Sequence, residues 1–142
     1  MAKLLAVGGP AFGASLLLTL LAVKGIGLHV LVVNRGVGFG MLASAPVLAA
    51  AVDFGGLLVV VWLTMRGPVR REAAVLVAAG GLANGFDRLF FPGVIDYWRV
   101  PPYPYVFNLA DVLIRLGVVW IVVDAVWRRR RAGVIPPAGP AR

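Results

Sequence analysis

The sequence predicts an all-α membrane protein with four transmembrane helices and with both termini in the cytoplasm. Three observations lead to this prediction. Of the 142 residues, 61% are hydrophobic and 14% are charged, and the mean hydropathy is +0.92, which is unusual for a water-soluble domain. Apolar stretches recur at about the 20-residue length that crosses a bilayer. Arginines cluster at the ends of two of these apolar stretches, as they do in loops that stay in the cytoplasm.

Four apolar stretches are predicted to span the membrane, at about residues 4–23, 41–64, 73–91 and 106–127. The first is expected to be retained as a span and not removed as a signal sequence. Because 142 residues hold at most about four such spans with their loops, residues 1–131 are expected to form a single domain. The remaining residues, 132–142, include three prolines and are expected to be disordered.

Basic residues set the predicted orientation, because loops rich in Lys and Arg stay in the cytoplasm. The link between the second and third stretches has three arginines within residues 66–71, and residues 128–131 are four consecutive arginines. Both segments are expected inside, which leaves residues 24–40 and 91–105 on the outer face. The four-arginine run is therefore interpreted as an anchor for membrane phospholipid and not as a nucleic-acid site.

The composition also excludes several kinds of site. The chain has no cysteine, so it forms no disulfide, thiolate metal site or thiol nucleophile. A single histidine, His29, does not support an imidazole zinc site and is interpreted as an interfacial hydrogen-bonding residue. The glycines of residues 36–40 do not match the nucleotide-binding loops. No metal and no organic cofactor are expected.

Two carboxylates are predicted to lie at similar depth in the third and fourth stretches. A rise of about 1.5 Å per residue places Asp87 roughly 21 Å from the inner face and Asp111 about 7 to 8 Å below the outer face. Each follows an asparagine by three residues, Asn84 and Asn108, so acid and amide share a helix face. Asp96, in the loop above, can reach the same depth. Depth alone therefore pairs Asp87 with Asp111 within a three-acid cluster.

Such a cluster suits aspartic peptidase chemistry. Carboxylates in a partly dry site do not all ionise, so one keeps its proton. One group then acts as general base on water and another as general acid on the leaving group. The alternative left open is structural: Asp87 pairs with Arg88 or Arg115, and Asp111 pairs with Arg115, as ion pairs that hold the helices together.

The other acids and nucleophiles have simpler interpretations. Asp124 is expected to form an i, i+4 surface pair with Arg128. Burying an ionisable residue within a span costs about 2.5 to 3.5 kcal/mol, and Asp53 lies near the midplane with no basic partner in its own span. It is interpreted as a protonated carboxyl hydrogen-bonded to a neighbouring helix, while a proton or ion path stays open. A serine–lysine pair of Ser44 and Lys24 also stays open.

Three motifs follow one another along the chain. They read NRGVGFG at residues 34–40, GGLANGFDR at 80–88 with GVID at 93–96, and FNLAD at 107–111. In order, spacing and membrane location, these motifs resemble those of the bacterial lipoprotein signal peptidases, signal peptidase II. The resemblance covers roughly residues 34 to 120.

The resemblance implies a peptidase that removes signal peptides from diacylglyceryl-modified prolipoproteins and cuts before the lipid-carrying cysteine. It also implies a multi-pass protein of the prokaryotic cytoplasmic membrane, with its active site near the outer face. The expected partners are the prolipoprotein and membrane phospholipid, and the chain is expected to be a monomer. By motif, Asp96 and Asp111 match the catalytic aspartates. The residues that match the supporting and substrate-binding positions are Asn34, Asn84, Asp87, Arg88 and Asn108.

The chain departs from the family pattern at its N-terminal end. Leu20 stands where the family has an aspartate four residues before Lys24, and nine residues, 25–33, take the place of a β-rich insertion. The alternative function is a non-catalytic membrane protein, either a degenerate relative that binds lipidated peptides or a small transporter component that uses Asp53. An enzyme is expected to need the two catalytic aspartates and to tolerate Asp53→Asn, and a transporter is expected to show the opposite.

Overall fold

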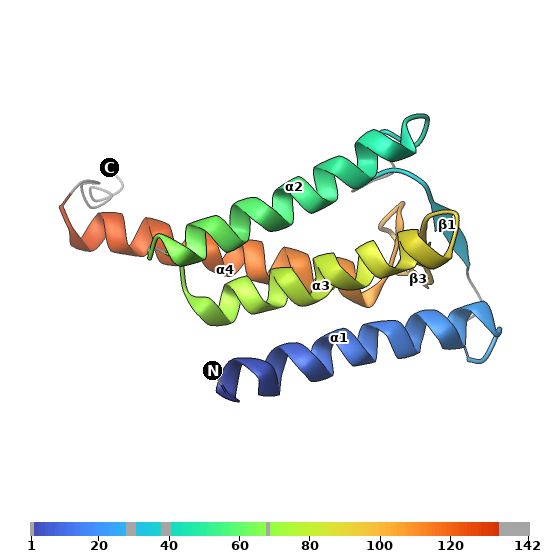
Figure 1. Ribbon diagram of the computed structural model, residues 1–142, viewed down its shortest axis with the longest axis horizontal. Helices are drawn as coiled ribbons and strands as arrows, with labels where there is room; N and C mark the ends of the chain where they lie inside the picture. Colours follow the sequence, from blue (N-terminus) through green and yellow to red (C-terminus); the bar gives the residue numbers. More distant parts are fainter. Residues whose placement is uncertain (1, 28–30, 38–40, 68, 134–142) are drawn as a thin grey trace.

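Four long helices run along one axis in this computed structural model, which describes residues 2–27, 31–37, 41–67 and 69–133. The helices are α1 (Ala2–Val23), α2 (Pro46–Met65), α3 (Arg71–Phe90) and α4 (Leu109–Arg131). Successive helices run in opposite directions, and α3 packs against each of the other three (Figure 1). The start of α1 and the end of α4 lie at one end of the bundle, and the β-strands lie at the other.

Three of these helices, α1, α2 and α3, are long and apolar enough to cross a membrane. Helix α4 has 23 residues but carries Asp111, Arg115 and Asp124 along its length, and it is not among those three. The fold is therefore mostly helical with three candidate spans. The fourth span and the orientation of the termini stay predictions.

Helices α3 and α4 approach closely because glycines lie where they touch. A Cβ atom on Gly80 would lie 2.5 Å from the carbonyl oxygen of Ala110, and one on Gly117 would lie 2.7 Å from that of Ala73. Real Cβ atoms do not come that near to backbone, so only glycine allows this separation. The close approach brings the polar side chains of the two helices within hydrogen-bonding reach.

Short strands connect the helices at the end of the bundle opposite the termini. Strand β1 (Val32–Asn34) pairs antiparallel with β2 (Val94–Asp96), and β3 (Trp98–Arg99) pairs antiparallel with β4 (Val106–Phe107). The predicted all-α class is therefore corrected to mostly helical with two short β-ribbons. The prolines after α3 prevent a helix there, and an extended backbone satisfies its N–H and C=O groups by pairing.

The ends of the helices differ in detail from the predicted stretches. Helix α2 begins five residues later than expected, at Pro46, after a turn in which Leu42 has a φ of 61°. Proline suits the first helical turn, where its missing N–H would have no partner. Helix α4 begins after the Asn108 cap and runs to Arg131, so the arginine run is helical. The predicted disordered tail lies, from residue 134 onward, outside the described residues.

Strand β2 is held against the end of α1 by a small apolar cluster. Ala22, Ile95 and Tyr97 are each no more than 3% exposed and contact one another. The cluster fixes β2, and with it Asp96, relative to the bundle.

Candidate active site

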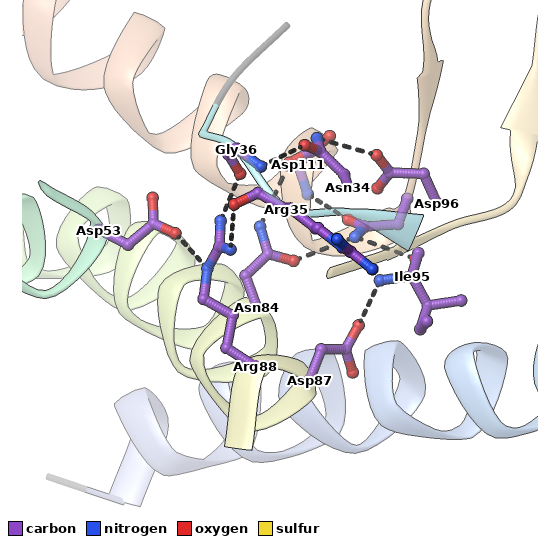
Figure 2. Close-up of polar contacts among 11 residues, drawn as sticks. Asn34, Arg35, Gly36, Asp53, Asn84, Asp87, Arg88, Ile95, Asp96 and Asp111 are labelled. Carbon is purple, nitrogen blue, oxygen red and sulfur yellow. Dashed lines mark hydrogen bonds and ion pairs between the residues drawn. The ribbon is translucent and has the colours of Figure 1, made fainter. Parts of the chain in front are cut away.

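The two predicted polar faces of α3 and α4 meet, and a chain of hydrogen bonds joins them (Figure 2). The Asn84 side-chain amide donates to Oδ1 of Asp111 at 3.3 Å. The Asn108 amide donates to Oδ1 of Asn84 at 3.0 Å and to the carbonyl oxygen of Ile95 at 3.3 Å. Oδ1 of Asn108 accepts from the backbone N–H of Asp111 at 2.8 Å and so caps α4. Asn84 and Asn108 therefore fix Asp111.

Asp96 lies at the end of β2 and faces the same region. It is 2% exposed, and its Oδ2 accepts a hydrogen bond of 3.2 Å from the side-chain amide of Asn34. Its Oδ1 is buried and has no hydrogen-bond partner among the described residues. Asp96 and Asp111 line one cavity of about 430 Å³, which opens between the β-strands and the start of α4.

The surroundings of Asp96 favour its protonated form. Burial raises its pKa first, and the negative charge of Asp111 raises it further, while the hydrogen bond from Asn34 lowers it. The result is a pKa of about 7. Oδ2 of Asp111 lies 3.6 Å from Nη2 of Arg115, one turn further along α4, and the two form an ion pair. One proton shared by two nearby carboxyls is the arrangement that general acid–base catalysis on water needs.

Asp87 does not pair with Asp111, as depth alone predicted, nor with Arg88 or Arg115. It accepts hydrogen bonds from the Thr19 hydroxyl of α1 at 3.4 Å and from the backbone N–H of Ile95 at 3.1 Å. Three residues along an α-helix turn by about 300°, which leaves the two side chains about 60° apart. This offset lets Asp87 reach α1 while Asn84 reaches α4. Asp87 therefore holds β2 in place beside the cavity.

Asp53 was predicted to hydrogen-bond to a neighbouring helix, and it has a basic partner there. Its Oδ2 lies 2.9 Å from Nε of Arg88, on the neighbouring helix α3. Nη1 of Arg88 also donates to the carbonyl oxygen of Arg35 at 3.3 Å, and Nη2 donates to that of Gly36. The prediction found the right kind of neighbour, another helix, but the partner is a guanidinium and the contact is an ion pair.

The structure bears differently on the remaining predictions, which concern Asp124, the Ser44–Lys24 pair and His29. Asp124 pairs with Arg128 at 2.7 Å, as predicted, and also with Arg70 at 3.1 Å. No hydrogen bond joins Ser44 to Lys24 among the described residues, so nothing in this part of the chain supports a serine–lysine dyad. His29 lies outside the described residues.

The fold defines the class as a mostly helical protein with candidate membrane spans. The structure resembles that of a bacterial membrane enzyme determined by the in meso method at 2.3 Å resolution, with a TM-score of 0.77 and 17% identity, over 100% of this chain and 95% of that one. A second bacterial membrane enzyme, determined by the same method at 1.9 Å resolution, gives a TM-score of 0.71 at 18% identity over 87% and 92% of the two chains. At these identities the likeness concerns the fold.

The sequence places the chain within that class. The profile of the family described as signal peptidase (SPase) II matches residues 14–127. A lipoprotein signal peptidase of Sulfurovum sp. (strain NBC37-1) is 40% identical over 97 residues, which cover 63% of this chain and 65% of that protein. One from Burkholderia cenocepacia (strain HI2424) is 36% identical over 117 residues, or 72% and 68% of the two. The chain belongs to the signal peptidase II family and is a peptidase.

Sequence reasoning missed two residues that shape the site, Tyr97 and Thr19, and the contact between Arg88 and Asp53. The Tyr97 hydroxyl accepts from the backbone N–H of Leu109 at 3.1 Å, and burial raises the pKa of Tyr97 to about 12, so it stays protonated. Thr19 donates to Asp87 across 68 positions of sequence, and Arg88 reaches Asp53 across 35. None of these contacts has a local signature, because each joins separate elements of the fold.

Proposed function

We propose that this chain removes signal peptides from diacylglyceryl-modified prolipoproteins by cutting before the lipid-carrying cysteine, with Asp96 and Asp111 as the catalytic pair. One observation carries the proposal: the two aspartates line a single cavity, each accepts a hydrogen bond from an asparagine amide, and the surroundings of Asp96 favour its protonated form. Membership of the signal peptidase II family supports the same substrate class.

In the proposed reaction, the ionised Asp111 takes a proton from a water molecule as that water attacks the scissile carbonyl carbon. The protonated Asp96 gives its proton to the amide nitrogen as the C–N bond breaks. Asp111 then holds the proton and Asp96 is ionised, and one proton transfer restores the starting state. The roles follow from the ion pair of Asp111 with Arg115 and from the raised pKa of Asp96. No metal or organic cofactor takes part in this reaction.

The supporting residues act on these two carboxyls. Asn34 donates to Asp96, and Asn84 and Asn108 fix Asp111. Asp87 holds β2, and Arg88 holds the segment after Asn34. Preorganised donors of this kind keep the reacting groups aligned without any cost at the moment of reaction.

The membrane arrangement that we propose has four spans, with α4 as the fourth and with both termini in the cytoplasm. The ion pair of Arg70 with Asp124 brings the link between α2 and α3 beside the last turns of α4, so the two basic segments lie at one end. The cavity lies at the other end, which is then the outer face of the prokaryotic cytoplasmic membrane. An acyl chain anchored in that leaflet would present its peptide near the cavity. A single domain over residues 1–131, acting as a monomer with bound phospholipid, completes the arrangement.

The substrate is tested by incubating the purified protein in detergent with a prolipoprotein, both with and without the diacylglyceryl group on its cysteine. The masses of the products identify the bond that is cut. We expect cleavage before the lipidated cysteine and no cleavage of the unmodified precursor. Equal cleavage of both precursors would contradict the proposed substrate, and the absence of cleavage by folded protein would favour the non-catalytic alternative.

The pH dependence of cleavage follows from the shared proton. Below about pH 7 Asp96 holds its proton, and above this value the proton is lost and no general acid remains. The rate constant at saturating substrate is therefore expected to fall as the pH rises through about 7, with an apparent midpoint that belongs to the pair. Rates measured between pH 5 and 9 check this, with Asp124→Asn as a control that keeps the same midpoint. A rate constant that increased above pH 7 would contradict the assignment.

A further inference from the structure

The guanidinium of Arg88 connects α2 to the segment that follows β1. Its three nitrogens reach Oδ2 of Asp53 and the carbonyl oxygens of Arg35 and Gly36 (Figure 2). The Arg88 side chain is 9% exposed and that of Asp53 is 27% exposed. A guanidinium this well buried is costly unless a carboxylate compensates its charge. Asp53 supplies that charge, whereas the two carbonyls supply only dipoles.

The segment that Arg88 holds is the one that carries Asn34. The Asn34 amide donates to Asp96, and Oδ1 of Asn34 accepts from the backbone N–H of Gly36 at 3.0 Å. Asn34 also pairs with Val94 in the β1–β2 register. Movement of residues 35 and 36 would therefore displace the side chain whose amide donates to Asp96.

Helix α2 contributes no residue to the cavity that Asp96 and Asp111 line, as far as the described residues go. Asp53 lies instead on an adjoining cavity of about 230 Å³, together with Asn34, Asn84, Arg88 and Asp111. Asp53 is therefore close to the site but separated from Asp96 by the Arg88 guanidinium and the loop. It lies beside Asp111 on this adjoining cavity, whereas its contacts toward Asp96 pass through Arg88 and residues 34–36.

We infer that Asp53 is a positioning residue of the peptidase site, which acts through Arg88 to fix residues 34–36 and so to hold the Asn34 amide on Asp96. The catalytic role in this inference rests on the proposed function. The contacts that lead from Asp53 to Asp96 do not depend on it. It reverses the expectation that the enzyme tolerates Asp53→Asn. None of the family motifs found in the chain includes position 53.

The first test follows the protonation of Asp96 directly. The chain has only five aspartates, so protein labelled with ¹³C at aspartate Cγ gives few carboxyl signals in NMR, and the Asp96→Asn spectrum assigns one of them. In Asp53→Asn the Asn34 hydrogen bond is weakened, and we expect the titration midpoint of Asp96 to rise by about half a pH unit or more. Asp53→Glu is expected to restore the wild-type midpoint. Asp124→Asn, which removes another arginine-paired carboxylate, is expected to leave it unchanged.

A double-mutant cycle tests whether Asp53 acts through Arg88. Asp53→Asn is expected to change the Asp96 midpoint in the wild type and to add nothing in an Arg88→Gln background. The double variant has no unpaired buried charge, so it remains informative if Asp53→Asn alone does not fold. An unchanged midpoint in folded Asp53→Asn would overturn the inference, and so would an equal shift in both backgrounds.

Enzyme kinetics test whether the contact of Asp53 with Arg88 affects the reaction. In Asp53→Asn we expect kcat to fall about tenfold while KM changes little, and Asp53→Glu to recover most of the loss. A rise in KM at unchanged kcat would assign Asp53 to substrate binding instead and overturn the positioning role. If the wild type cleaves no prolipoprotein, the proposed function fails, while the NMR titration still decides whether Asp53 controls Asp96.

Discussion

Asp96→Asn is expected to lower kcat about 10²- to 10⁴-fold, the loss typical of removing a general acid. Asparagine keeps the shape of the side chain and can still accept from the Asn34 amide, but it cannot give a proton to the leaving nitrogen. Product formation followed by mass measures the loss. Asp124→Asn serves as the control, because it removes a carboxylate at the opposite end of the bundle, where Asp124 pairs with Arg70 and Arg128.

The same substitution is expected to stabilise the fold at high pH. Because the folded-state pKa of Asp96, about 7, lies above the usual 3.8, the folded protein binds more protons than the unfolded chain between these values. Stability is therefore fully present below about pH 4 and is lost as the pH rises through about 7. Asn does not ionise, so at pH 8 the variant should be more stable, by on the order of 1–4 kcal/mol. Thermal unfolding in detergent at pH 4 and pH 8 checks this, and equal melting temperatures at pH 8 would contradict it.

Gly80→Ala is the second substitution with a large expected effect. Its new Cβ would lie 2.5 Å from the Ala110 carbonyl oxygen and 2.8 Å from Cγ1 of Ile114, so α4 must move away from α3. Overpacking of this kind costs about 1–3 kcal/mol. A shift of about 1 Å between α3 and α4 also pulls Asn84 from Asp111, and misalignment on this scale can cost about 10²-fold in rate.

The neighbouring glycine provides a control for Gly80→Ala. The nearest atom to a Cβ on Gly81 is Cδ1 of Leu57 at 3.8 Å, which is ordinary contact. Gly81→Ala should therefore be neutral or stabilising by up to about 1 kcal/mol, since alanine favours helix more than glycine does. Melting temperature and cleavage rate are measured for both variants. Equal behaviour of the two would mean that close packing of α3 on α4 does not control the site.

Much of the fold was predictable because its signals are local. Apolar stretches of the right length marked the helices, and the three-residue spacing of Asn84 to Asp87 and of Asn108 to Asp111 placed polar groups on known helix faces. The spacing also showed its limit. Asn84 faces Asp111, but Asp87 turns toward Thr19, because depth along a helix does not specify direction around it.

The rest of the site depends on contacts between distant parts of the chain. Strand β1 pairs with a strand about 60 positions away. Strands of three residues are too short for an alternating pattern to predict them from the sequence. The span that contains Asp53 has no basic residue, and its partner Arg88 lies in another span, within a motif that already gave it a role. The sequence therefore offered no reason to pair the two. Only the packing of α2 on α3 shows that the two belong together.

The central claim, that Asp96 and Asp111 are the catalytic pair, is tested most directly by comparing four proteins on the same lipid-modified prolipoprotein. These are the wild type, Asp96→Asn, Asp111→Asn and Asp87→Asn, each shown to be folded. We expect cleavage before the lipidated cysteine by the wild type, a loss of at least about 10²-fold in the Asp96 and Asp111 variants, and a smaller loss in Asp87→Asn. Cleavage that survives in Asp96→Asn and disappears in Asp87→Asn would contradict this pair and restore the pair that depth alone suggested.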